Sequence, residues 1–157
     1  MSWKDTYKVW QERTDLEPDL KQELAAMSDD KEIEDAFYGP LSFGTAGMRG
    51  LMGPGINRMN VYTVRQATEG LATLMDSLGD DIKKRGVAIG YDSRHNSRKF
   101  AHDAARVLGA HGIKVYIYDN LRPTPELSFA VRHMGTYAGI MITASHNPKE
   151  YNGYKIY

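Results

Sequence analysis

Residues 138–157, with the sequence AGIMITASHNPKEYNGYKIY, contain the pattern that decides the fold. The continuous apolar run AGIMITA (138–144) is typical of a strand that is covered on both faces. A polar loop follows it directly. Similar apolar runs occur at GVAIGY (86–91) and IKVYIYD (113–119). These three runs predict strands of one sheet.

Segments with helical spacing separate the three runs. Asn60 is a candidate N-cap for a helix that ends near Leu78. Ser97 opens a second helix, and Thr124 begins a third. Strands that alternate with helices in this way predict an α/β fold. We expect an open sheet, mixed or mostly parallel, with helices on both faces.

Residues 1–38 have a different pattern, in which apolar residues recur at helical spacing. Pro18 suits a first helical turn, and Ser28, followed by two aspartates, is a candidate N-cap. We therefore expect a helical N-terminal extension at 1–38, followed by one domain at 39–157. The aromatic side chains of the extension would pack onto that domain, and a partner-binding face is the alternative. They are Trp3, Tyr7 and Trp10.

The composition excludes several kinds of site. With 20 basic and 20 acidic residues, the chain has no net charge to attract nucleic acid or an anionic membrane over a distance. The absence of cysteine excludes disulfides, thiolate zinc sites and cysteine nucleophiles, and it fits a reducing compartment. No apolar run approaches the roughly 20 residues that span a bilayer, and the charged N-terminus is unlike a signal peptide. We expect a soluble, cytoplasmic protein with no nucleic-acid or membrane partner.

Three loops are candidates for a binding site, because ligands of open α/β sheets gather at the carboxyl ends of the strands. GTAGMRG (44–50) follows the short apolar run LSF (41–43), which we interpret as a further strand. YDSRHNSR (91–98) and ASHNP (144–148) follow two of the three runs described above.

The first loop combines three glycines with two polar side chains. Gly44, Gly47 and Gly50 would let backbone amides approach a phosphate. Thr45 could donate a hydroxyl, and Arg49 could grip two phosphate oxygens. The loop lacks the glycine-lysine-serine/threonine ending of a Walker loop. An ordinary glycine turn is the alternative interpretation.

The second loop contains two arginines, and Arg94 or Arg98 could meet an anion. The alternative is structural. Asp92 and Arg94 would lock the loop through a salt bridge, and Ser97 would cap the following helix.

The third loop contains adjacent serine and histidine residues, Ser145 and His146. Neighbouring residues of a loop rarely point at each other, and the glycine-x-serine-x-glycine elbow is missing, which argues against an acyl-enzyme hydrolase. A serine can instead carry a phosphoryl group, which adds negative charge and three acceptor oxygens. His146, Lys155 and Arg49 could supply the cations that such a group requires.

Asn152-Gly153 predicts a tight turn, after which residues 154–157 would form a strand. Tyr154 and Lys155 would then lie on opposite faces. The strand could turn Lys155 back towards the serine loop, and a solvated strand lysine is the alternative. If no helix covers this strand, Tyr154, Ile156 and Tyr157 would be partly exposed.

Five motifs resemble those of the α-D-phosphohexomutase superfamily, and they most resemble its bacterial phosphoglucomutase branch. They occur in the family's order and cover residues 36–157. The resemblance implies domain I of this family for residues 39–157, truncated at its C-terminus. The motifs are FGTAGMRG (43–50), VRQATEGL (64–71), GVAIGYDSR (86–94), LRPTPELSFAVR (121–132) and TASHNPKEYNGYK (143–155).

The resemblance implies a role for each candidate residue. Ser145 matches the serine that is phosphorylated and passes its phosphoryl group to the sugar phosphate, and its phosphate supplies one oxygen to Mg²⁺. His146 and Lys155 match the catalytic surround, with Lys155 as a general acid/base or charge-stabilising group. Thr45 and Arg49 match the substrate-binding loop that faces the phosphoserine.

The implied activity interconverts glucose 1-phosphate and glucose 6-phosphate through glucose 1,6-bisphosphate, with Mg²⁺ as cofactor. The implied partners are a hexose phosphate and the remaining domains of the same enzyme. The family's aspartate-rich metal loop, Asp-x-Asp-x-Asp, does not occur in this sequence, so we expect the isolated chain to lack turnover. A phosphomannomutase or phosphopentomutase domain is one alternative, and a non-catalytic phosphosugar-binding or interaction module is another.

Overall fold

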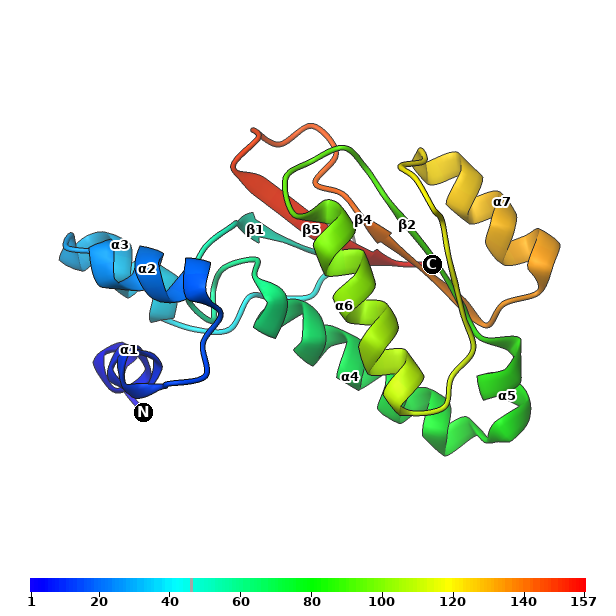
Figure 1. Ribbon diagram of the computed structural model, residues 1–157, viewed down its shortest axis with the longest axis horizontal. Helices are drawn as coiled ribbons and strands as arrows, with labels where there is room; N and C mark the ends of the chain where they lie inside the picture. Colours follow the sequence, from blue (N-terminus) through cyan, green and yellow to red (C-terminus); the bar gives the residue numbers. More distant parts are fainter. Residues whose placement is uncertain (46) are drawn as a thin grey trace.

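The computed structural model describes residues 1–45 and 47–157, and its centre is one five-stranded sheet (Figure 1). The strand order is β1-β5-β4-β2-β3. Strand β2 is parallel to β3 and β4, whereas β5 is antiparallel to β1 and β4. The sheet is therefore mixed and open, as the sequence predicts. The strands are β1 (Met48–Leu51), β2 (Val87–Tyr91), β3 (Val115–Ile117), β4 (Ala138–Ile142) and β5 (Tyr151–Ile156).

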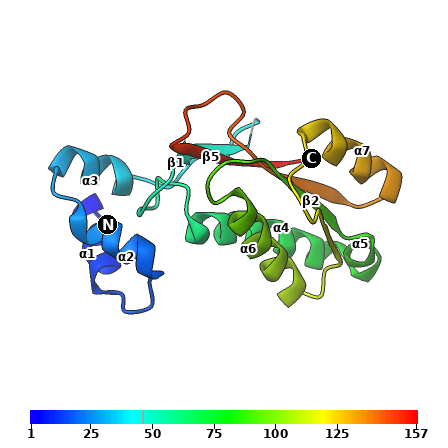
Figure 2. The ribbon, with the colours of Figure 1, turned by 45° about the horizontal axis from the view of Figure 1, so that its top comes forward.

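Helices cover both faces of the sheet (Figure 2). Helices α4 (Val61–Leu78) and α6 (Ser97–Ala110) pack with the strands into the main core, and α7 (Thr124–Met134) packs on the opposite face. A short helix, α5 (Asp80–Arg85), connects α4 to β2. All residues of β2 and β4 are buried, which explains their continuous apolar sequences. Among the described residues, no helix is both long and apolar enough to cross a membrane.

The cap predictions have different outcomes. Asn60 caps α4: its side chain accepts hydrogen bonds from the backbone N–H groups of Tyr62 and Thr63. Ser97 begins α6 but does not cap it, because its hydroxyl donates to Asp92 Oδ1 at 2.6 Å instead. Asn96, in the left-handed conformation, occupies the N-cap position without a side-chain hydrogen bond to the helix.

The N-terminal extension folds as three helices, α1 (Trp3–Glu12), α2 (Pro18–Ala26) and α3 (Asp30–Phe37). Pro18 lies in the first turn of α2 as predicted, but the cap of α3 is Asp29 and not Ser28. Trp10 is buried between Phe37 and Tyr62 of α4, with both ring centroids 5.6 Å away. Trp10 therefore packs onto the following domain as predicted, whereas the Tyr7 ring lies 5.3 Å from the Phe37 ring within the extension.

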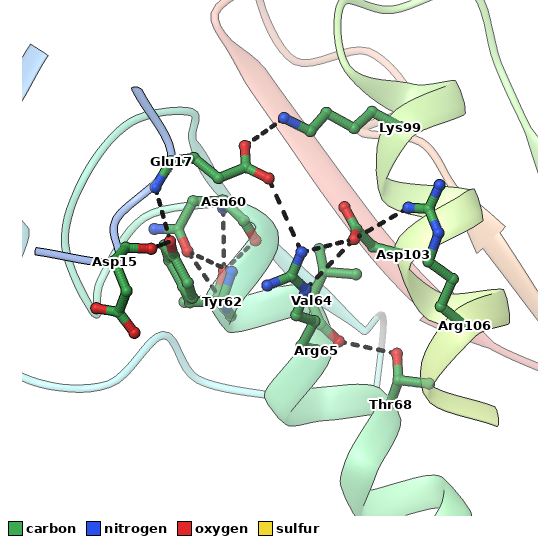
Figure 3. Close-up of polar contacts among 11 residues, drawn as sticks. Asp15, Glu17, Asn60, Tyr62, Val64, Arg65, Thr68, Lys99, Asp103 and Arg106 are labelled. Carbon is green, nitrogen blue, oxygen red and sulfur yellow. Dashed lines mark hydrogen bonds and ion pairs between the residues drawn. The ribbon is translucent and has the colours of Figure 1, made fainter. Parts of the chain in front are cut away.

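The extension also carries a charge opposite to that of the domain. Residues 1–38 include eleven acidic and five basic residues, whereas residues 39–157 include nine acidic and fifteen basic ones. Figure 3 shows where the charges meet: the Glu17 carboxylate pairs with Lys99 of α6 and lies 3.8 Å from Arg65 of α4. Ion pairing therefore adds to the apolar contact between the extension and the domain.

The structure corrects the prediction for the end of the chain. Asn152 and Gly153 lie inside β5 and do not form a turn. Strand β5 is inserted between β1 and β4, so Tyr154 is completely buried and its hydroxyl lies 2.9 Å from Thr68 Oγ1. Burial raises the pKa of this hydroxyl. Ile156 and Tyr157 are partly exposed, as expected.

The apolar run LSF (41–43) is not a strand, contrary to the sequence interpretation. The strand forms later, at β1, because residues 48–51 are the ones that pair with residues 151–154 of β5. Leu41 and Phe43 instead contribute side-chain packing: Leu41 contacts the main core, and the Phe43 ring lies against Tyr154. GTAGMRG therefore leads into a strand and partly forms it.

Replacing Glu17 by glutamine should weaken the docking of the extension. The change removes the anion between Lys99 and Arg65 and leaves two cations near each other. We expect the free energy of unfolding to fall by about 1 kcal/mol, and by less at high salt because salt screens partly exposed charges.

Urea denaturation followed by tryptophan fluorescence measures this loss, because both tryptophans lie in α1. The matched control is Glu12→Gln, which removes only an exposed pair with Lys8 on the same helix. Equal losses of stability in the two variants would contradict the prediction.

His111 should make the stability pH-dependent. It follows α6, and its Nδ1 and Nε2 lie 2.5 Å from Asp76 Oδ2 and 2.7 Å from Glu69 Oε1, both on α4. Hydrogen bonds with Asp76 and then Glu69 raise the pKa of His111. The stabilisation is complete below the unfolded pKa, about 6.5. It is lost as the pH rises through the higher folded pKa.

Urea denaturation of the wild type and His111→Gln between about pH 5.5 and 9, which brackets the ordinary histidine pKa, tests this prediction. The stability difference between the two proteins should shrink as the pH rises. A His133→Gln variant, altered on α7, should retain the pH dependence of the wild type. A difference for His111→Gln that does not change with pH would refute the assignment.

Candidate active site

The serine loop begins where β4 ends, at the carboxyl edge of the parallel strands. Ala144 is fully buried, whereas Ser145 and His146 are exposed. Ser145 has a φ of 56°, in the left-handed region that few residues other than glycine adopt. Its N–H donates to Thr143 Oγ1 at 3.1 Å, and the Asn147 N–H donates to the Ala144 carbonyl at 3.1 Å. This tight turn presents the serine hydroxyl to solvent.

The loop after β2 lies against the serine loop. Asp92 accepts hydrogen bonds from the Arg94 N–H at 3.0 Å and from the Ser97 hydroxyl, and Arg94 Nε lies 3.5 Å from Asp92 Oδ2. The predicted Asp92–Arg94 salt bridge is therefore present. Arg94 turns its guanidinium to the serine loop, where its four hydrogen bonds go to backbone carbonyls. Arg98 is exposed on α6.

The glycine-rich loop meets β5 through its backbone. The N–H groups of Gly44 and Gly47 donate to each other's carbonyls at 3.0 Å, so these two amides are engaged within the loop. This arrangement agrees with the alternative of an ordinary glycine turn. Gly47 has a φ of 82°, and a Cβ there would lie 2.3 Å from the Tyr154 carbonyl oxygen. Ala46, which belongs to the same motif, lies outside the described residues.

Arg49 and Lys155 lie on one face of the sheet. Arg49 is directly opposite Gly153 in the antiparallel pair of β1 and β5, and Lys155 follows Gly153 by two residues. Side chains alternate along a strand, so Arg49 and Lys155 are diagonal neighbours on the same face. Arg49 Nη1 also lies 3.4 Å from Asn147 Oδ1, a weak hydrogen bond that joins β1 to the serine loop. The ion pairs of the described residues include neither Arg49 nor Lys155.

Thr45 and Arg49 also share an open hollow of about 360 Å³, which Ser42, Gly44 and Gly47 complete. Thr45 is exposed, and the Lys155 stem passes Gly47, because a Cβ on Gly47 would lie 3.1 Å from Lys155 Cγ. Thr45, Arg49 and Lys155 therefore lie near one another, and the contact between Arg49 and Asn147 joins this group to the serine loop. Their arrangement offers an exposed hydroxyl and nearby positive charge, which suits phosphoryl chemistry.

The residues described do not form a metal site by themselves. Within 1–45 and 47–157, no group of three or more His, Cys, Asp or Glu side chains could hold a metal ion. Mg²⁺ prefers a near-octahedral set of oxygen ligands, and a serine with its phosphate could offer only part of such a set.

A comparison with protein families shows which family this chain belongs to. The family model described as phosphoglucomutase/phosphomannomutase, alpha/beta/alpha domain I, matches residues 40–157. The chain belongs to this phosphohexomutase family. The matched residues include the sheet and the candidate site.

Relatives in the phosphohexomutase family carry two activity names. The chain is 41% identical over 152 residues to a phosphopentomutase of Homo sapiens, which covers 93% of this chain and 25% of the relative. It is 46% identical over 149 residues to a phosphoglucomutase of Staphylococcus saprophyticus, covering 95% of this chain and 26% of the relative. The chain thus spans about a quarter of the length of the curated relatives it matches.

A solved structure has the same fold. The crystal structure of a protein assigned as a phosphomannomutase, from Thermus thermophilus, matches with a TM-score of 0.66 and 35% identity. The match covers 75% of this chain and 25% of that one. A phosphoglucomutase/phosphomannomutase family protein of Burkholderia thailandensis matches with a TM-score of 0.60 and 24% identity, over 73% of this chain and 25% of the other.

Sequence reasoning did not identify Asn152 as part of the site's support. Its amide is buried and donates to the His95 carbonyl at 3.1 Å and to Ser97 Oγ at 3.0 Å. Asn-Gly is a common turn signal, so the sequence favoured a turn at this position. A buried polar residue between strands has no local signal that distinguishes it from a turn asparagine.

Replacing Gly153 by alanine should destabilise the junction of the three strands. A Cβ at this position would lie 2.5 Å from the Thr143 carbonyl oxygen and 2.9 Å from the Met48 carbonyl oxygen. We expect a loss of about 1–3 kcal/mol or more, because backbone atoms cannot move aside cheaply. Gly70→Ala is the control, because a Cβ there enters open space on α4 and favours the helix. Urea denaturation compares the variants, and a Gly153→Ala variant as stable as the wild type would contradict the prediction.

Proposed function

We propose that this chain is the catalytic-serine domain of a phosphoglucomutase, which interconverts glucose 1-phosphate and glucose 6-phosphate. The observation that carries the proposal is the exposed Ser145 on its tight turn, in a loop that Arg49 contacts through Asn147. The family relationship and the phosphoglucomutase relatives support it. A serine in this setting can hold a phosphoryl group that neighbouring cations stabilise.

The proposed reaction has two phosphoryl transfers. In the first, the 6-hydroxyl oxygen of glucose 1-phosphate attacks the phosphorus of phosphorylated Ser145. The new P–O bond forms as the bond to Oγ breaks, and the hydroxyl proton passes to the enzyme and then to Oγ. The product is glucose 1,6-bisphosphate. After this intermediate reorients, Oγ attacks the phosphorus of its 1-phosphoryl group. The new P–O bond forms as the bond to the sugar O1 breaks, and the Oγ proton passes through the enzyme to O1, which restores phosphoserine and releases glucose 6-phosphate.

The other candidate residues would neutralise the phosphoryl oxygens and transfer the proton in these two steps. Phosphoryl transfer requires alignment of the two oxygens and neutralisation of the phosphoryl oxygens. Arg49 presents a planar fork that suits phosphate, and Thr45 can donate a hydroxyl hydrogen bond. Lys155 and His146 would supply or receive the proton, or hold charge, next to the serine loop.

Mg²⁺ and the rest of the enzyme belong to the same proposal. One phosphate oxygen on Ser145 is the ligand that this chain can offer to Mg²⁺, and the described residues do not complete a site. We infer that other domains complete the binding of the metal and the hexose phosphate, in line with relatives about four times as long. The chain by itself should accept a phosphoryl group from glucose 1,6-bisphosphate but turn over little substrate.

A phosphopentomutase or a phosphomannomutase is the second candidate. The human relative at 41% identity is named phosphopentomutase, and the Thermus structure is assigned as a phosphomannomutase. All three reactions would use the same phosphoserine, so the geometry of this domain supports them equally. Comparing the turnover of glucose, ribose and mannose 1-phosphates by an enzyme that contains all the domains separates them.

Replacing Ser145 by alanine should abolish phosphorylation of the chain. We would incubate the wild type with glucose 1,6-bisphosphate and Mg²⁺ and locate phosphate by mass spectrometry. One phosphoryl group on Ser145 is expected in the wild type and none in Ser145→Ala, because the attacking oxygen is gone. Ser77→Ala, altered on α4 far along the chain from the loop, should be labelled like the wild type. A wild-type chain that stays unlabelled, or is labelled elsewhere, would overturn the proposal.

A further inference from the structure

Arg94 binds the serine loop through four hydrogen bonds to backbone carbonyls. Its Nη2 donates to the carbonyls of Ser145 at 2.9 Å and Asn147 at 2.6 Å, and its Nη1 donates to those of Pro148 at 2.8 Å and Tyr151 at 3.1 Å. The Arg94 side chain is only 15% exposed. One guanidinium therefore gathers four carbonyl oxygens that span the loop from the reactive serine to the start of β5.

We propose that Arg94 is a positioning residue that fixes the Ser145 turn in its reactive conformation. It does not need to touch the sugar phosphate or the phosphoryl group, because its N–H donors are directed to the backbone of the loop. Its effect on the reaction would pass through Ser145. The part of this inference that concerns phosphoryl transfer rests on the proposed function.

The conformation of Ser145 explains why the turn requires such support. A serine with a φ of 56° is strained, and it persists only where its surroundings hold it there. The turn's own hydrogen bonds are two, one to Thr143 Oγ1 and one to the Ala144 carbonyl. Arg94 adds charge-assisted bonds to the carbonyls of the same loop, and such bonds are stronger than neutral ones.

Arg94 itself is anchored by the half-buried Asp92, behind which Ser97 and Asn152 are buried. Asp92 faces it from the same loop, with its Oδ2 3.5 Å from Arg94 Nε, and the Asp92 N–H donates to the Ile142 carbonyl at the end of β4. Ser97 and Asn152 hold the base of the loop from α6 and β5. The guanidinium thus connects the exposed serine loop to residues that are fixed on the sheet and on α6.

The planar fork of arginine is essential to this role. The two terminal nitrogens of Arg94, held at a fixed separation, reach four carbonyl oxygens. A lysine ammonium on a flexible stem cannot reproduce this geometry. We therefore expect Arg94→Lys to behave like Arg94→Gln and not like the wild type, although it keeps the charge. This expectation separates positioning from a simple electrostatic effect on a phosphate.

The first experiment does not depend on activity. Hydrogen–deuterium exchange of a peptide covering residues 143–151 should be at least tenfold faster in Arg94→Gln and Arg94→Lys than in the wild type. The matched control is Arg85→Gln, which loses an arginine hydrogen bond to the Gly135 carbonyl away from the serine loop. Wild-type exchange of this peptide in folded Arg94 variants would overturn the proposal.

The second experiment measures the rate of Ser145 phosphorylation by glucose 1,6-bisphosphate. A misplaced nucleophile should lower the maximal rate about 10–100-fold, while the donor concentration at half-saturation changes little. Methylguanidinium should restore part of the rate in Arg94→Ala, where it can occupy the vacated space. A fall in affinity alone, with an unchanged maximal rate, would show that Arg94 binds the donor and overturn the positioning role.

A third measurement, of thermal stability, applies if the variants fold poorly. If the Arg94 variants are too unstable to study alone, adding Ser145→Gly to Arg94→Gln should recover thermal stability, because glycine accepts the left-handed conformation without strain. The absence of such coupling would count against the proposal. If the wild-type chain is not phosphorylated at all, the proposed function fails, and the exchange experiment still decides the role of Arg94.

Discussion

The insertion of β5 between β1 and β4 is the constraint on which the rest of the structure depends. Two glycines permit it: a Cβ on Gly153 would meet the Thr143 carbonyl oxygen at 2.5 Å, and one on Gly47 would meet the Tyr154 carbonyl oxygen at 2.3 Å. On the other face, Tyr154 is completely buried and its hydroxyl pairs with Thr68 of α4. Backbone contact on one side and a filled core on the other fix the position of β5.

This position brings separate segments into one candidate site. The antiparallel register places Arg49 and Lys155 on the same face, and the serine loop must close between β4 and β5. Beneath it, the Ser97 hydroxyl joins the Asp92 carboxylate to the Asn152 amide through hydrogen bonds. Buried polar groups that are fully hydrogen-bonded are rigid, so an exposed loop can still hold a defined geometry.

The helical extension is joined to this domain by different forces. Trp10 supplies apolar contact with Tyr62, and Glu17 supplies charge opposite Arg65 and Lys99. Helix α6, which carries Lys99, begins directly after the loop that contains Arg94. The extension therefore contacts the helix that follows the Arg94 loop, and Arg94 in turn binds the serine loop.

The sequence by itself determined the elements that local chemistry dictates. The apolar runs indicated β2 and β4, the Asn60 cap indicated the start of α4, and the motifs, including the one around Ser145, indicated the family. Only the tertiary structure decided the pairing of β5 and the burial of Tyr154. It also decided that Arg94 binds backbone carbonyls of the serine loop. All three features depend on which backbone segments approach each other. Neither propensity nor periodicity contains that information, since contacts between distant segments arise only when the sheet closes.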